Sequence, residues 1–265
     1  MIQSSKLQAA LGELEWKAFN ELNDVSDYIW KSPGFLKHER SAEERKMAVY
    51  FPNGGETAEL RQQLESMKLD ETFPRLIAVA NLFVALSVFE SHVLLLLKVL
   101  QEHNMTAPKQ ELRHGIKRHL EATKVYGADP YGAQYHEQVS IAISIRNCLM
   151  HAKGLLVSSR EARALKAQIV QRKYMSSEIR KKYTKRGDSK DNHLVRIETS
   201  GLGEQLVITN EYSHVANSYL REYFRSLCGT LNPNTALRPV VELFAPEDLT
   251  VEATFEGPKI KGPIM

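Results

Sequence analysis

The sequence predicts a mainly α-helical protein with one small β hairpin late in the chain. Apolar residues recur at helical spacing over much of residues 4–152, and residues 76–97 are almost continuously apolar. By contrast, "HLVRIETSGLGEQLVITN", residues 193–210, alternates apolar and polar side chains around a glycine-rich turn, which is typical of a hairpin. A chain of 265 residues is long enough to bury a substantial core.

The first segment is expected to be an N-terminal helical extension over residues 1–70. An amphipathic helix is predicted for residues 4–30, with an apolar stripe made by Leu7, Leu11, Leu14, Ala18, Leu22 and Val25. The stretch "KSPGF" is expected to break this helix, and "FPNGG" predicts a second turn near residue 53. A shorter helix is expected over residues 56–68.

The second segment, residues 71–157, is expected to be a helical core. Its first helix should begin just after Pro74, because proline suits a first turn, and should end before "HNMTAP". The apolar run 76–97 has the length of a membrane span. We instead expect a buried core helix, because the run contains side chains that are costly in lipid, namely Asn81, Ser87, Glu90, Ser91 and His92.

Two further helices complete this core. A polar helix is predicted over residues 109–125, where "YGADPYG" stops it, and another over residues 132–152, with Gly154 as its terminator.

The rest of the chain is expected to pack with the helical core as one compact unit. Residues 158–230 should contain a basic loop, the hairpin and a closing helix near 211–228, and residues 231–265 a proline-rich irregular tail. The basic stretch 172–190 is most simply a solvated loop. Alternatively it holds RNA phosphates, with Tyr174 and Tyr183 stacking on bases.

One segment, "ISIRNCLMHAKG" at residues 143–154, combines a core helix with charged residues. On a helical wheel, Ser140, Ser144, Asn147 and His151 form a polar stripe, and Arg146 lies about 140° from His151. Ile143 and Met150 point away from the core stripe in this projection. An outward apolar face is typical of a covered surface, so we expect Ile143 and Met150 at a two-fold homodimer contact. The simpler alternative is that Arg146 and His151 are surface residues without chemistry.

The pattern "RNCLMHAKG" resembles the signature of the HEPN superfamily, in which an Arg is followed by a polar residue, often Asn, and four to six residues separate the Arg from a His. The resemblance covers roughly residues 70–157 and implies an up-and-down helical bundle. It also implies a metal-independent endoribonuclease with a toxin or antiviral-defence role, in which two motifs meet across a dimer interface. Other members of the superfamily have lost activity and serve as RNA- or protein-binding modules, which is the alternative reading here.

The residue types fit that chemistry. A ribose 2′-OH that attacks the neighbouring phosphate needs a base of near-neutral pKa, and His151 supplies an imidazole. Arg146 is a planar cation suited to the negative oxygens of the transition state. Asn147, about 40° from His151 on the helix, is placed to orient the imidazole or bind a phosphate oxygen. The expected products are a 2′,3′-cyclic phosphate and a 5′-OH.

Glu90 is expected to support Arg146. Each is an isolated charge within an apolar helix, and a buried carboxylate is costly unless it is paired. The alternatives are that Glu90 reaches solvent or pairs with His92 or Lys98.

Composition limits cofactors and location. We expect no metal and no other cofactor, because no histidine has a defensible metal-ligand spacing with cysteine or acidic residues. Two cysteines cannot form a disulfide framework, and the N-terminus lacks a signal-peptide pattern, so a cytoplasmic location is expected. The expected partners are substrate RNA, a second copy of the chain and an antitoxin or defence-system protein, and no membrane.

Overall fold

The computed structural model describes residues 2–103, 115–185 and 194–231. The chain is mainly helical and contains a small late antiparallel hairpin, as the sequence predicts. The elements are α1 (Ile2–Tyr50), α2 (Glu56–Met67), α3 (Phe73–His103), α4 (Ile116–Thr123), α5 (His136–Ala152), α6 (Ala162–Val170), α7 (Ser177–Lys185), β1 (Val195–Ser200), β2 (Gly203–Ile208) and α8 (Asn210–Leu231).

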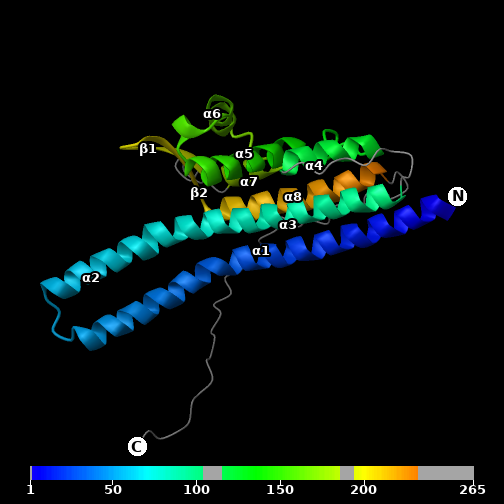
Figure 1. The fold of residues 1–265 in the computed structure, drawn as a ribbon. Helices are drawn as coiled ribbons and strands as arrows, with labels where there is room; N and C mark the ends of the chain where they lie inside the picture. Colours follow the sequence, from blue (N-terminus) through cyan, green and yellow to red (C-terminus); the bar gives the residue numbers. More distant parts are fainter. Residues whose placement is uncertain (1, 104–114, 186–193, 232–265) are drawn as a thin grey trace, which may run out of the picture.

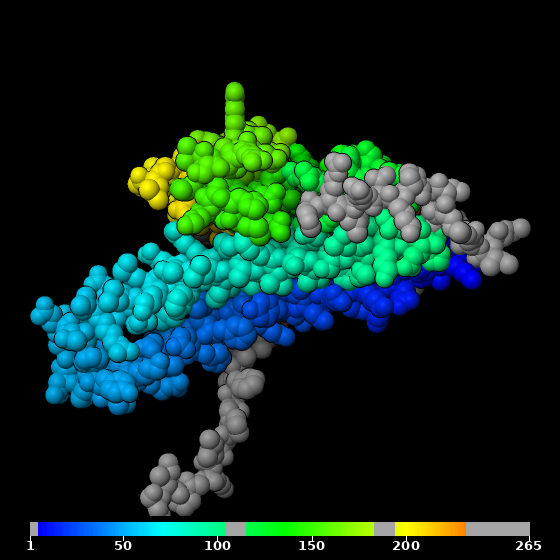
Figure 2. Space-filling model, in the orientation of Figure 1, coloured from blue at the N-terminus to red at the C-terminus, as the bar shows by residue number. Residues whose placement is uncertain are grey.

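The centre of the fold is a layer of three long helices, α1, α3 and α8 (Figure 1). Helix α1 runs antiparallel to the other two. Glu21 and Ser32 of α1 contact His92 and Asn81 of α3, and Leu22 and Ile29 contact Asn217 and Asn210 of α8, so the residue numbers run in opposite directions. Helix α3 contributes a fully buried face that includes Phe89, whose ring packs edge-on against Tyr223 and Phe224 of α8. The space-filling view shows the ends of α1 and α2 projecting beyond the body formed by the later helices (Figure 2).

The expected break of the first helix at "KSPGF" is wrong, because α1 continues through Pro33 to Tyr50. A proline inside a helix leaves the carbonyl four residues earlier, here that of Ile29, without its backbone donor. Two side chains replace that donor. The Ser32 hydroxyl lies 2.8 Å and the Asn210 amide 2.9 Å from the Ile29 oxygen, so tertiary contacts stabilise a helix that the local sequence disfavours.

The expected fresh helix start at Pro74 is also wrong. Helices α2 and α3 form one continuous helix, joined by a π-helical turn over Lys68–Thr72. In this turn the Phe73 N–H donates to the Lys68 carbonyl, five residues earlier. The wider turn accommodates Pro74, which has no N–H of its own to donate.

The continuous helix Glu56–His103 has the length and the apolar composition of a membrane span. The core helices of soluble proteins often have both properties as well. The side of α3 that faces α1 and α8 is completely buried, in agreement with the expected core helix. Leu76, Val84 and Leu95 lie on its exposed side.

A second layer, made by α4 and α5, packs on α3 and α8. Helix α5 begins at His136, later than expected, because Asp129 first closes a tight turn by accepting hydrogen bonds from the N–H groups of Tyr131 and Gly132. Helix α4 begins at Ile116, and residues 109–114 of the predicted helix lie outside the described residues.

The predicted loop over the basic stretch 172–190 is wrong for Ser177–Lys185, which form α7, and a further helix, α6, precedes that stretch. These helices bury Leu165, Ile169 and Ile179. The apolar spacing that marks them is difficult to recognise in the sequence because most of the surrounding residues are charged or polar. The hairpin pairs Val195 with Ile208 and Ser200 with Gly203. Of the predicted tail, residues 231–265, only Leu231 is described, as the last residue of α8.

Candidate functional site

The C-terminal end of α5 is fixed against the hairpin. Lys153 and Gly154 adopt left-handed backbone conformations (φ 50° and 80°), and the Gly154 N–H donates to the Cys148 carbonyl at 3.1 Å, which ends the helix as predicted. The Gly154 carbonyl accepts from the Leu206 N–H at 2.8 Å. A Cβ at position 154 would lie 3.0 Å from the Leu206 oxygen, so this close approach favours glycine.

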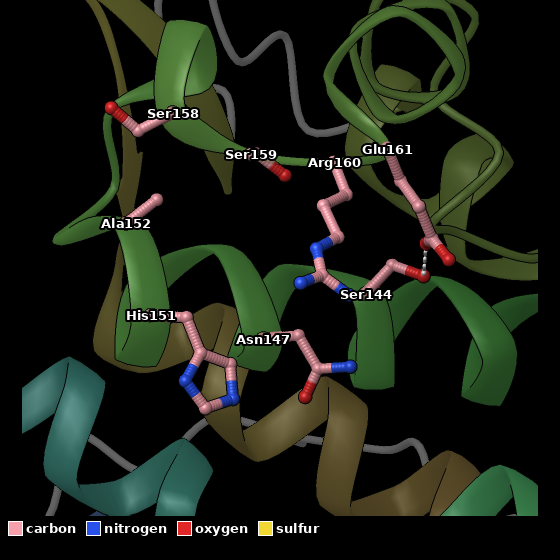
Figure 3. A pocket seen from close by; sticks show the side chains of 8 residues that line it. All are labelled: Ser144, Asn147, His151, Ala152, Ser158, Ser159, Arg160 and Glu161. Atoms are coloured by element: carbon pink, nitrogen blue, oxygen red, sulfur yellow. Dashed lines mark hydrogen bonds between the residues drawn. The ribbon is translucent and has the colours of Figure 1, made fainter.

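A polar cavity of about 570 Å³ opens between this half of α5 and the turn that leads into α6 (Figure 3). The helix supplies one wall and the turn supplies the other. The lining residues are Ser144, Asn147, His151, Ala152, Ser158, Ser159, Arg160 and Glu161. Two of the predicted site residues, Asn147 and His151, therefore share one cavity.

In the cavity lining the carboxylate is paired, whereas two of the nitrogen-bearing side chains are not paired with any described residue. The carboxylate of Glu161 accepts from the Ser144 hydroxyl at 3.0 Å and lies 3.5 Å from the Lys117 ammonium, so it is already paired. By contrast, neither Arg160 nor His151 has a hydrogen bond or an ion pair with any residue that the structure describes. The site is thus suited to an anionic ligand rather than a cation.

Arg146 lies beside this cavity rather than in its lining. Its Nη2 is 3.9 Å from Glu90 Oε2, so the predicted contact between these residues is present, though long. Its Nη1 donates to Asn147 Oδ1 at 3.4 Å, and its buried Nε has no hydrogen-bond partner within the described part of the chain. Asn147 therefore connects Arg146 to the cavity.

Glu90 has a second neighbour that the sequence did not indicate. His119 of α4 places its Nδ1 3.5 Å from Glu90 Oε1, outside hydrogen-bonding geometry but close enough for an ion pair when the imidazole is protonated. The alternative partner His92 instead lies 3.0 Å from Glu21. In "IKRHLEAT" the residues Ile116, His119, Leu120 and Thr123 recur at helical spacing, a periodicity that would have placed His119 on the buried face.

The expected outward position of Ile143 is wrong, and that of Met150 is right. Ile143 is only 3% exposed, because α4 packs over the first half of α5 and covers this side of it. Met150 lies further along α5 and is 43% exposed. Met150 alone remains as a predicted dimer contact.

Arg160 is the functional candidate that the sequence did not reveal. It follows the motif helix by several residues and reaches the cavity only because the turn at Ser158–Glu161 folds back over α5. No spacing rule along one helix predicts that contact. The nearest signal is that Arg160 is the first arginine after the motif.

Two other groups are poor candidates for chemistry. Tyr174, which the alternative reading gave a base-stacking role, is 1% exposed and packs edge-on against Tyr212, so it is not placed to stack on a base. The side chain of Tyr183 lies outside the described residues. Burial raises the pKa of the Cys148 thiol despite a hydrogen bond with Ser159, so Cys148 is a poor nucleophile at neutral pH.

Within residues 2–103, 115–185 and 194–231, no cluster of His, Cys, Asp and Glu side chains has the arrangement of a metal site. Comparisons of the chain with protein-family models, with curated proteins and with solved structures gave no match.

Proposed function

We propose that the chain is a metal-independent endoribonuclease of the HEPN type, with a HEPN-like up-and-down core over residues 71–157. The observation that carries the proposal is that His151 and Asn147 of the motif line one open polar cavity, with Arg146 hydrogen-bonded to Asn147 at its edge. The motif thus combines a solvent-accessible imidazole with groups that bind anions. A cytoplasmic toxin or antiviral-defence role, with an antitoxin or defence protein as partner, extends the same proposal.

In the proposed reaction His151 accepts the proton of a ribose 2′-OH. The 2′ oxygen then forms a bond to phosphorus, and the bond from phosphorus to the 5′ oxygen of the next nucleotide breaks. The leaving oxygen takes a proton from water. Cationic and amide groups stabilise the negative charge on the phosphoryl oxygens in the transition state.

The position of Arg146 favours a dimeric arrangement. Its contacts with Glu90 and Asn147 hold it at the edge of its own cavity. The exposed Met150 lies one helical turn later on the same side of α5. A second copy that packs on this surface would bring a second Arg146 and a second His151 close to the first pair. We therefore propose a homodimer in which both motifs line one shared cleft.

The test is incubation of the purified protein with single-stranded RNA in EDTA, followed by analysis of the product ends. Wild type should yield 2′,3′-cyclic phosphates, and His151→Ala should be slower by a factor of about 10²–10⁴. His38→Ala, which changes an exposed histidine on α1, is the matched control and should cut like wild type. Equal activity in His151→Ala and wild type would exclude His151 as the base.

A mixing experiment tests whether Arg146 of one copy can work with His151 of the other. Arg146→Ala and His151→Ala proteins, each expected to be strongly impaired alone, are combined under conditions that exchange subunits. Recovered cleavage would show that Arg146 of one copy works with His151 of the other. No recovery after confirmed exchange would contradict a site that one arginine and one histidine from different copies can complete.

A second candidate is a non-catalytic HEPN-like module that binds RNA or a protein. The contact of Arg146 with Glu90 favours it, because a neutralised guanidinium stabilises a developing negative charge less well. RNA binding by wild type without any cleavage in the experiment above would support this candidate over the enzyme.

A further inference from the structure

We propose that Arg160 is the phosphate-binding residue of the cavity, and that the cavity holds one backbone phosphate of single-stranded RNA. The identity of the ligand as RNA rests on the proposed function. The assignment of Arg160 rests on the geometry of the cavity.

The first argument is that the Arg160 guanidinium is directed into the cavity and is not used for folding. It extends from the turn before α6 toward Asn147 and Ser144 on α5 (Figure 3). The adjacent carboxylate, Glu161, is engaged by Ser144 and Lys117. Arg160 itself makes no hydrogen bond or ion pair with the described residues, so its five N–H donors are available to a ligand.

The second argument is the chemistry of the other walls. Ser158 and Ser159 bring hydroxyl groups, Asn147 brings an amide, and His151 brings an imidazole. Guanidinium, hydroxyl and amide groups are the side chains that most often bind phosphate oxygens in nucleic-acid complexes. A cavity of about 570 Å³ is within the range of small-molecule sites and has room for a nucleotide around its phosphate.

The third argument is that the two arginines near the cavity have different surroundings. Arg146 is paired with Glu90 and bonded to Asn147, whereas Arg160 is unpaired and lies in the same cavity as His151. A phosphate held by Arg160 would be placed beside the proposed base within a single chain. Arg146 would then act on that cavity by orienting Asn147 or from the second copy.

The experiment measures binding separately from cleavage. A short, fluorescently labelled single-stranded RNA with 2′-O-methyl riboses cannot be cut by 2′-OH attack, so anisotropy titrations in EDTA report affinity alone. Arg160→Ala should weaken binding by about tenfold or more and lower the salt dependence of log K by about 0.7, the value for one phosphate contact on a single strand. Arg160→Lys should recover the salt dependence but only part of the affinity, because lysine lacks the planar fork.

Arg163→Ala is the matched control. Arg163 is an exposed arginine only three residues later, on α6, and does not line the cavity. Its removal should change affinity by less than about twofold. Circular dichroism melting of each variant checks that the fold is intact, which is expected because the Arg160 side chain is exposed.

The outcomes separate this proposal from the proposed function. If Arg160→Ala binds like wild type, or if wild type does not bind the RNA, the assignment of Arg160 is wrong, whatever the cleavage assay shows. If Arg160→Ala loses binding but wild type does not cut ordinary RNA, the phosphate site stands and the nuclease proposal fails. Equal losses in Arg160→Ala and Arg163→Ala would indicate a diffuse basic surface and would also overturn the assignment.

Discussion

Replacing Glu90 by Gln tests whether this carboxylate positions Arg146. The change keeps the size and shape of the side chain and removes its charge. In the structure Glu90 Oε2 lies 3.9 Å from Arg146 Nη2, and its other oxygen lies 3.5 Å from His119 Nδ1. Loss of the charge leaves a largely buried guanidinium whose remaining hydrogen bond is the one to Asn147 Oδ1.

The magnitude follows from distance and burial. Two unit charges 3.9 Å apart attract by about 4 kcal/mol at an effective dielectric constant of about 20. The Arg146 and Glu90 side chains are 20% and 22% exposed, so solvent screening and desolvation offset much of that attraction. We expect a net coupling of about 1–2 kcal/mol in the free energy of unfolding, which corresponds to a factor of about 5–30 in the folding equilibrium.

The assay is a double-mutant cycle measured by urea unfolding with circular dichroism. Glu90→Gln should destabilise the wild type by the coupling energy and should have little effect in an Arg146→Ala background. Glu102→Gln, on the exposed side of the same helix, is the control and should stay within about 0.5 kcal/mol of wild type. In the cleavage assay Glu90→Gln should also slow the reaction without abolishing it.

Additive effects of the two substitutions, within about 0.3–0.5 kcal/mol, would refute the coupling. Glu90 would then act through His119 or through solvent instead of through Arg146. A Glu90→Gln variant that is destabilised but cleaves RNA at the wild-type rate would show that the pair is structural only.

Two further predictions concern assembly and pH. Met150→Glu should convert the proposed dimer into a folded monomer in sedimentation velocity, because like charges would meet across the two-fold axis; a wild type that is already monomeric at micromolar concentration would exclude the dimer. Burial lowers the pKa of His214 from its ordinary value of 6.5, with a smaller contribution from Arg221 that is opposed by Glu211 and Asp27. The neutral imidazole therefore stabilises the fold above about pH 6.5, and this stability is lost as the pH falls through the lower folded-state pKa. Urea unfolding should show a shallower loss between about pH 7 and pH 5 in His214→Gln than in wild type, and identical slopes would contradict this account.

Ile143 and Pro33 show where local patterns lead to a wrong expectation. The wheel of α5 places Ile143 opposite the main core stripe, yet α4 covers that side and buries it. Pro33 has a strong helix-breaking tendency, but Ser32 and Asn210 satisfy the carbonyl that it leaves open. In both cases a partner far away in the sequence changes the energetic balance, and a single-helix pattern contains no information about that partner.

By itself the sequence predicted the helical class, the hairpin and the end of α5 at Gly154, and it left Glu90 with few candidate partners, of which Arg146 was one. These follow from apolar periodicity, from turn residues and from the cost of an isolated buried charge, all of which act locally or leave very few possible partners. Only the tertiary structure decided that His151 shares a cavity with Arg160 and that Arg146 is turned toward Glu90 and His119. The reason is that these neighbours come from separate elements. The turn before α6 and helix α4 are brought against α5 by tertiary packing, and a pattern within one helix does not contain that arrangement.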